Sequence, residues 1–216
     1  PQDTEGLLAM LSPPVRNWFR DKFPDFTRPQ KLAIPAIMDR KHLLLCSPTG
    51  SGKTLTAFLT VIDKLVRMAL DGKLKKKVHC VYISPIKALA NDIQRNLIGP
   101  LTEISERYLP DRAQEIKVGL RTGDTPQSER QRMLKHPPHI LITTPESLAI
   151  AITSPKFQPI VSELEYMIVD ELHSLVPTKR GVHLGLTLSY LDTLLRTPVQ
   201  RIGISATMEP LEKVAE

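Results

Sequence analysis

The chain has 216 residues, of which 41% are hydrophobic and 24% are charged. This composition predicts a folded domain with a packed core and excludes a largely disordered or low-complexity chain. Its 29 basic and 23 acidic side chains give a net charge of +6, which permits a polyanionic partner without establishing one.

Short apolar segments alternate along the chain with longer amphipathic ones. The predicted strands are residues 42–46, 78–84, 117–120, 139–143, 166–170 and 201–205, all nearly continuously apolar, as expected of strands covered on both faces. In the segment after the first strand, the apolar residues that share one helical face are Leu55, Phe58, Leu59, Ile62, Leu65, Val66 and Ala69. This alternation predicts an α/β fold in one domain over residues 1–216, a mostly parallel sheet with helices on both faces.

Hydroxyl residues followed by proline recur near the ends of the predicted strands. The pairs are Ser47-Pro48, Ser84-Pro85, Thr125-Pro126 and Thr144-Pro145. Since Ser and Thr cap helices and Pro fits the first helical position, each pair predicts the start of a helix. Helix N-termini can hold anions, and in a parallel sheet they gather at the carboxyl edge. The pairs therefore indicate either a phosphate-binding face or ordinary helix capping.

The strongest motif lies between the first strand and the amphipathic helix, over residues 47–54. It has the context and spacing of a P-loop, although Ser47 stands where the first glycine is usual. The predicted ATP-binding residues are Pro48, Thr49, Gly50, Ser51, Gly52, Lys53 and Thr54. The two glycines let backbone N–H groups face phosphates. Lys53 is expected to contact the β- and γ-phosphates, and Thr54 to bind Mg²⁺.

Two adjacent carboxylates end the fifth predicted strand, in the segment Asp170-Glu171-Leu172-His173. Asp170 is expected to hold Mg²⁺, directly or through water, and Glu171 to orient and polarise the attacking water. His173 is a further catalytic candidate, with a structural histidine as the alternative. The acidic pair is weak alone, but together with a P-loop it indicates ATP hydrolysis, because metal binding and water activation need both.

The order of these motifs resembles the first RecA-like domain of superfamily-two helicases. The P-loop comes first, the acidic box second and the segment Ser205-Ala206-Thr207 last. Residues 26–30 resemble the Q motif, residues 82–92 resemble motif Ia, and residues 121–126 and 144–148 resemble the next two nucleic-acid motifs. Residues 122–131 and 178–183 are typical of the Lhr (large helicase-related) group. The resemblance covers roughly residues 15–208.

The resemblance implies roles for further residues. Gln30 would select adenine through its amide, with Phe23 or Phe26 stacking on the ring or else serving as core aromatics. Ser205 and Thr207 would couple the acidic box to the nucleic-acid side. The implied contacts to nucleic-acid phosphates are Ser84, Pro85, Lys87, Arg121, Thr144, Pro145, Lys179 and Arg180, a solvated face being the alternative for the last two.

The implied activity is that of an Lhr-type helicase that requires ATP and Mg²⁺. Its partner would be single-stranded or partly duplex nucleic acid, and it would unwind DNA or RNA:DNA hybrids in a repair-linked role. The second RecA-like domain, which completes the ATP site, is absent from this chain, so the chain alone should be nearly inactive. The alternatives are a related DExH RNA helicase and a nucleotide-dependent switch or scaffold ATPase that does not act on nucleic acid.

No apolar run is long enough to cross a membrane, so no membrane partner is expected. The two cysteines, Cys46 and Cys80, lie in apolar runs and are too few for a disulfide framework or a four-ligand zinc site. They are predicted to be buried and reduced, which indicates a cytoplasmic protein, associated with the nucleoid if its source is prokaryotic.

Overall fold

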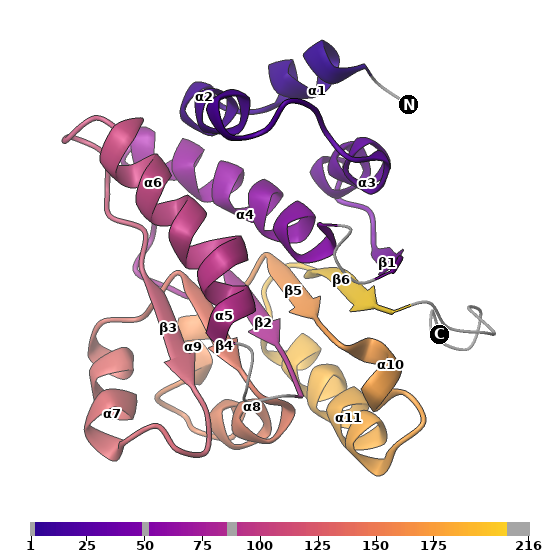
Figure 1. The fold of residues 1–216 in the computed structure, drawn as a ribbon. Coiled ribbons are helices and arrows are strands. Elements are labelled where there is room, and N and C mark those ends of the chain that lie inside the picture. Colours follow the sequence, from indigo (N-terminus) through magenta and orange to yellow (C-terminus); the bar gives the residue numbers. More distant parts are fainter. Residues whose placement is uncertain (1–2, 49–51, 86–89, 207–216) are drawn as a thin grey trace.

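The centre of the molecule is a six-stranded sheet in which every strand pair is parallel, in the order β1-β6-β5-β2-β4-β3 (Figure 1). The computed structural model describes residues 3–48, 52–85 and 90–206, without the side chains of residues 90 and 91. The strands are β1 (Leu43–Cys46), β2 (Cys80–Ile83), β3 (Val118–Arg121), β4 (Ile140–Thr143), β5 (Tyr166–Val169) and β6 (Gln200–Ser205). The predicted strands and the α/β fold class are thus confirmed.

Helices cover both faces of this sheet (Figure 1). They are α1 (Thr4–Met10), α2 (Pro13–Lys22), α3 (Arg28–Met38), α4 (Lys53–Leu70), α5 (Ala90–Ile93), α6 (Gly99–Arg107), α7 (Gln127–Lys135), α8 (Pro145–Ile152), α9 (Gln158–Val161), α10 (Leu172–Leu175) and α11 (Lys179–Leu194). A π-helix, η1 (Gln94–Ile98), joins α5 to α6. One core packs α1 to α4 and α6 against the sheet, and a second core packs α8, α9 and α11 against the opposite face.

The strand β2 shows how one sheet serves two cores. Cys80 and Tyr82 belong to the core on the α4 face, whereas Val81 and Ile83 belong to the core on the α11 face. Successive side chains of a strand point to opposite faces, so a strand covered on both sides must be apolar throughout. The predicted strand begins too early, at residue 78. The N–H of His79 donates to the carbonyl of His139 at 2.8 Å, before the ladder of β2 starts.

The helix α4 carries the largest part of the first core. All seven residues of its predicted apolar face are buried, which confirms that prediction. Burying a Leu or Phe side chain contributes about 2 kcal/mol, so this face fixes the helix firmly against the sheet. Both cysteines are free, as predicted. Cys80 is buried, as predicted, whereas Cys46, which was also predicted to be buried, is half-buried.

The pairs of Ser or Thr with Pro differ from one another in the structure. Thr144 caps α8 through the N–H of Ser147, with Pro145 as the first helical residue, as predicted. The prediction is wrong for Ser47-Pro48, because α4 begins only at Lys53, near the end of the P-loop. It is also wrong in detail at the start of α7, where Pro126 itself is the N-cap. Residues 86–89 lie outside the described part of the chain, so the prediction for Ser84-Pro85 stays a prediction.

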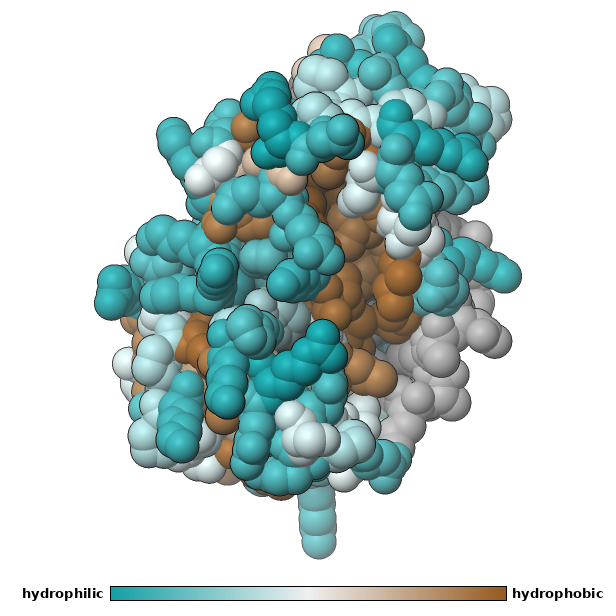
Figure 2. All heavy atoms as spheres, turned by 90° about the vertical axis from the view of Figure 1, so that its left-hand side faces the viewer, coloured by the Kyte–Doolittle hydropathy of each residue, from teal (hydrophilic) through white to brown (hydrophobic). Residues whose placement is uncertain are grey.

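One face of the described molecule is mainly polar. Figure 2 shows the side where β3, α6 and α7 lie, with an apolar area between mostly polar residues. The exposed large hydrophobic residues of the described part are Leu32, Leu120, Ile150, Val182, Leu186 and Tyr190. Scattered exposed apolar residues are usual on folded domains. None of the described helices combines the length and the apolar character needed to span a bilayer.

Candidate nucleotide and nucleic-acid sites

The carboxyl ends of the strands divide one edge of the sheet into two halves. The ends of β1, β6 and β5 are neighbours and lead into the P-loop, Ser205 and Asp170; we call this the P-loop half. The ends of β2, β4 and β3 lead into or carry Pro85, Thr144 and Arg121; we call this the β4 half. Ligands of parallel sheets bind at the carboxyl ends of the strands. The strand order therefore separates the predicted ATP residues from the predicted nucleic-acid residues.

A cavity of about 700 Å³ opens in the P-loop half. Its lining joins the beginning of α4, the residues after β5, the end of β6 and parts of α2, α5, η1 and α6. The predicted residues in the lining are Gly52, Lys53, Thr54, Asp170, Glu171, His173 and Ser205. The volume is that of an ordinary small-molecule site. The P-loop and the acidic box, far apart in sequence, thus form one site.

The ammonium group of Lys53 lies between the ends of two neighbouring strands. Gly52, the N-cap of α4, has a φ of 78°, a left-handed conformation that favours glycine. From the first position of α4, Lys53 Nζ donates to the carbonyl oxygens of Ser47, just after β1, and Ser205, in β6, the latter at 2.8 Å. The charge is therefore held at the centre of the P-loop half.

The carboxylate of Asp170 is buried and has two donors. Its Oδ1 accepts from the N–H of Glu171 at 2.7 Å, and its Oδ2 accepts from the hydroxyl of Tyr82. Burial raises the pKa of Asp170 above its ordinary value, and these two hydrogen bonds act in the opposite direction. Tyr82 was not singled out from the sequence, because nothing local to β2 indicates that its hydroxyl meets a residue of β5.

The side chain of His173 connects the acidic box to the end of β6. Its Nδ1 accepts from the N–H of Ala206 at 3.0 Å and lies 3.3 Å from the hydroxyl of Ser205. Since Nδ1 accepts from a backbone donor, Nε2 carries the proton of the neutral ring. Nε2 lies 2.9 Å from Oε2 of Glu171. The geometry suits both the coupling predicted for Ser205 and a structural role for the histidine.

Gln30, the residue predicted to select adenine, is part of a capping box at the start of α3. The side-chain oxygen Oε1 of Gln30 accepts from the backbone N–H of Thr27 at 2.8 Å, while the backbone N–H of Gln30 donates to the hydroxyl of Thr27. Its Nε2 points toward the P-loop, since a Cβ added to Gly52 would lie 3.4 Å from it. The amide oxygen thus stabilises the helix, and the amide nitrogen is the part directed toward the site.

Of the two candidate stacking residues, only Phe23 lines the cavity. Phe26 is buried and stacks on Phe19 with ring centroids 4.0 Å apart, so it is a core aromatic. Trp18 also lines the cavity and was not anticipated; its indole N–H donates to Glu103 at 2.7 Å. The position of Trp18 depends on the packing of α2 against α6. The sequence does not indicate this packing, because the two helices are distant along the chain.

In the β4 half, several polar groups are already bound within the protein. Thr144 is buried, and its hydroxyl donates to Oγ of Ser147 at 2.9 Å. Ser84 is also buried, and its N–H donates to the carbonyl of Thr143 at 3.0 Å. The guanidinium of Arg121 lies 5.7 Å from the centroid of the Phe157 ring. Burial lowers the pKa of Arg121.

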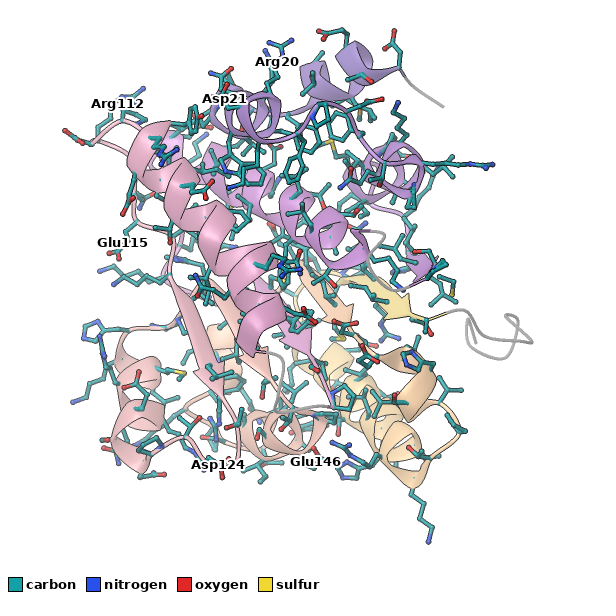
Figure 3. All side chains as sticks on the ribbon, in the orientation of Figure 1. Arg20, Asp21, Arg112, Glu115, Asp124 and Glu146 are labelled. Atoms are coloured by element: carbon teal, nitrogen blue, oxygen red, sulfur yellow. The ribbon has the colours of Figure 1, made fainter. Side chains whose placement is uncertain are left out.

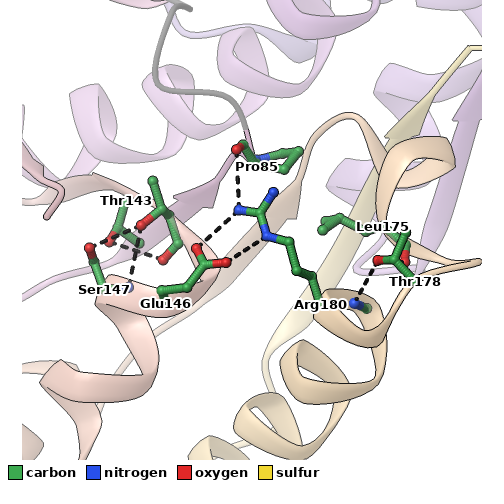
Figure 4. A network of polar contacts seen from close by, with 9 residues as sticks. Pro85, Thr143, Glu146, Ser147, Leu175, Thr178 and Arg180 are labelled. Carbon is green, nitrogen blue, oxygen red and sulfur yellow. Dashed lines mark hydrogen bonds and ion pairs between the residues drawn. The ribbon is translucent and has the colours of Figure 1, made fainter.

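Arg180, predicted as a nucleic-acid contact, joins three elements of the β4 half. Its Nε and Nη2 donate to both carboxylate oxygens of Glu146, at 2.6 and 3.0 Å (Figure 4). Nη2 also donates to the carbonyl of Pro85 at 3.2 Å. Asp124 and Glu146 both lie near the ends of β3 and β4, at the lower margin of the molecule (Figure 3). Lys179, next to Arg180, is exposed at the start of α11.

Five predicted residues lie outside the described part of the chain. They are Thr49, Gly50 and Ser51 of the P-loop, Lys87 after β2, and Thr207 after β6. Pro48, which is described, is exposed near the start of the P-loop.

The described residues fit a magnesium ion that is bound together with a nucleotide. Thr54 and Asp170 line the same cavity and offer oxygen atoms, the ligand type that Mg²⁺ prefers. Within the described ranges, no group of three or more His, Cys, Asp and Glu could hold a metal by itself. Mg²⁺ in nucleotide sites commonly takes one or two protein ligands, phosphates and water, so this sparse donor set is the expected one.

The family model described as DEAD/DEAH box helicase matches residues 27–214. The chain therefore belongs to the DEAD/DEAH box helicase family. Within that family, it is 50% identical over 214 residues to the ATP-dependent helicase Lhr-Core of Methanocaldococcus jannaschii, covering 98% of this chain and 25% of the relative. It is 43% identical over 223 residues to the Lhr helicase/uracil glycosylase of Escherichia coli, covering 100% of this chain and 14% of the relative. The resemblance to the Lhr group is thus confirmed.

Solved structures agree with this assignment. The Mycobacterium smegmatis helicase Lhr bound to ssDNA and AMP-PNP matches with a TM-score of 0.87 and 45% identity, covering 99% of this chain and 27% of that one. The DEAD-box helicase Mss116 bound to ssRNA and UDP-BeF matches with a TM-score of 0.79 at 21% identity, which shows a shared fold alone. The chain spans about a quarter of the length of the Lhr-Core relatives.

Proposed function

We propose that this chain is the ATP-binding motor domain of an Lhr-type helicase, the first of two RecA-like domains. The observation that carries the proposal is the cavity of the P-loop half, where Lys53, Asp170 and Glu171 come together. The assignment to the Lhr group supports it, since relatives of that group are named ATP-dependent helicases. The share of those relatives that the chain spans supports a further domain in the whole protein.

In the proposed reaction, the P-loop half binds and orients the triphosphate. Lys53 places its charge against the β- and γ-phosphates, and the backbone around Gly52 holds the phosphate oxygens. Bound Mg²⁺ supplies charge neutralisation at the phosphates, with Thr54 and Asp170 as its protein partners. Glu171 accepts a hydrogen bond from the attacking water and so aims its oxygen at the γ-phosphorus. An arginine from the second domain would complete the site.

The β4 half is proposed to bind the backbone of a nucleic-acid single strand. The N-terminus of α8, capped by Thr144, and the beginning of α11 present N–H groups and Lys179 at this edge. Such contacts fix the position of a strand and not its sequence, as a translocating motor requires. The related Lhr structure holds ssDNA. We propose single-stranded DNA as the track and a DNA duplex or an RNA:DNA hybrid as the unwound substrate, in a repair-linked role.

The first experiment measures the ATPase rate of the full-length protein with no polymer, with single-stranded DNA and with single-stranded RNA. We expect a stimulation of tenfold or more by single-stranded DNA, the proposed track, because the strand would close the two RecA-like domains on ATP. An unchanged rate in a folded protein that binds ATP would contradict the proposal and favour a nucleotide-dependent switch. ATP hydrolysis by the 216-residue chain alone should be about 10³-fold slower than stimulated hydrolysis by the full-length protein, because no arginine from a second domain would reach the site.

A further inference from the structure

Tyr82 is a fully buried tyrosine in the middle of the sheet. It lies on β2, faces the core beneath α4, and has its ring centroid 5.0 Å from that of Phe58. A buried phenol needs a hydrogen-bond partner, because an unpaired hydroxyl costs about 1 to 3 kcal/mol. Its partner is Oδ2 of Asp170, the carboxylate proposed to hold Mg²⁺.

The backbone and the side chain of Asp170 are fixed separately. The ladder between β2 and β5 pairs Tyr82 with Ile168, and it continues as the N–H of Asp170 donates to the carbonyl of Ile83 at 2.8 Å. This fixes the Cα position. The rotation of the carboxylate is fixed by its two donors, the N–H of Glu171 on Oδ1 and the hydroxyl of Tyr82 on Oδ2.

We propose that Tyr82 is a positioning residue for Mg²⁺ binding. Its hydroxyl holds the Asp170 carboxylate in the orientation in which that group joins the binding of Mg²⁺ and nucleotide. Hydrogen-bond partners of metal-binding side chains orient those side chains, and their loss typically lowers metal affinity 10- to 100-fold. The inference rests on the proposed function, because it concerns the Mg²⁺–ATP site of the P-loop half.

The hydrogen bond between Tyr82 and Asp170 also connects the two halves of the sheet edge. Tyr82 is followed, at the carboxyl end of β2, by Ser84 and Pro85, which belong to the β4 half. Arg180 holds the carbonyl of Pro85. Among the described side chains in the proposed sites, the hydroxyl of Tyr82 thus makes a direct contact between a strand of the β4 half and a carboxylate of the P-loop half.

The test is the variant Tyr82→Phe, which removes the hydroxyl and keeps the ring that packs on Phe58. Binding of a fluorescent, non-hydrolysable ATP analogue to the full-length protein is measured at equilibrium while Mg²⁺ is titrated. We expect the Mg²⁺ concentration at half-maximal binding to rise about tenfold. The matched control is Tyr166→Phe, because Tyr166 is another buried tyrosine, at the amino end of β5 and away from the cavity. It should keep the wild-type midpoint.

Further variants separate positioning from a general loss of fold. Thermal unfolding of each variant is recorded, and Tyr82→Leu, which also lacks the hydroxyl, must shift the midpoint in the same direction. In an Asp170→Ala background, adding Tyr82→Phe should cause no further shift, because the contact it removes is already lost. A wild-type midpoint in Tyr82→Phe, or an additional shift in the double variant, would overturn the inference while leaving the proposed function intact. A wild-type protein without Mg²⁺-dependent binding would instead contradict the proposed function itself.

Discussion

The two halves of the sheet edge use their polar residues in opposite ways. In the P-loop half, Lys53, Asp170 and Glu171 line a cavity of about 700 Å³. In the β4 half, Thr144 caps a helix, and Arg180 is bound to both carboxylate oxygens of Glu146. The P-loop half thus gathers its charged side chains around a cavity, as the proposed ATP site requires. The β4 half offers mainly helix ends and surface charge, which suits a strand that slides.

The largest effect should come from Lys53→Ala in the full-length protein. We expect nucleic-acid-stimulated ATP hydrolysis to fall by about 10² to 10³-fold, the loss typical when a preorganised charge at a transition state is removed. Binding of single-stranded DNA without nucleotide should stay within about twofold, since the β4 half is untouched. Lys64→Ala, at an exposed position of the same helix, is the control. Intact stimulated hydrolysis in Lys53→Ala would break the division into two halves.

A smaller effect is expected from Lys179→Ala in the β4 half. Loss of one phosphate contact should weaken single-strand binding several-fold and reduce the slope of log affinity against log salt by about 1. Lys135→Ala is the matched control, because Lys135 ends α7, which leads back to the amino end of β4. Equal salt slopes for wild-type protein and the Lys179 variant would remove Lys179 from the interface. Intrinsic ATP binding should not change in either variant.

The pair of Glu146 and Arg180 provides a finer test of the β4 half. Glu146→Gln should lower the free energy of unfolding by less than about 1 kcal/mol, because the pair is half exposed. Freed from its partner carboxylate, Arg180 should then raise single-strand affinity about two- to threefold by adding a phosphate contact. Glu129→Gln, which breaks an exposed ion pair with Arg132 on α7, should leave that affinity unchanged. Weaker binding by Glu146→Gln would show that the ion pair maintains the surface.

The last comparison concerns the opposite edge of the sheet, and it provides a reference for both halves. Burial, with His79 and Lys117 adding to the effect, lowers the pKa of His139 to about 4. Because the folded pKa of His139 lies below its unfolded value of about 6.5, the free energy of unfolding of the protein decreases as the pH falls between those two values. Denaturant unfolding from pH 7 to 4 should therefore show a decrease in the free energy of unfolding, and this decrease should be smaller in His139→Asn than in the wild-type protein. The exposed His136→Asn should keep the wild-type slope.

The sequence was sufficient for those features that depend on local pattern. The apolar strands, the buried face of α4 and the cap at Thr144 follow from periodicity and capping chemistry, and the P-loop spacing follows from a backbone requirement at Gly52. Contacts between distant segments were not predictable. The bonds of Tyr82 to Asp170 and of Arg180 to Glu146 join residues of different elements. Such partners are chosen by the sheet order, which no local pattern determines.

The place of the Lys53 ammonium has a consequence for affinity. It donates to one carbonyl just after β1 and another in β6, two strands that are neighbours in the sheet. An ammonium has three N–H donors, so one remains for a phosphate oxygen, and any further contact to a triphosphate competes with the backbone oxygens for the same charge. The affinity for ATP therefore reports the difference between two sets of contacts. A variant that weakens the contacts of the ammonium to the two backbone carbonyls, without changing its contacts to the phosphates, would bind nucleotide more tightly.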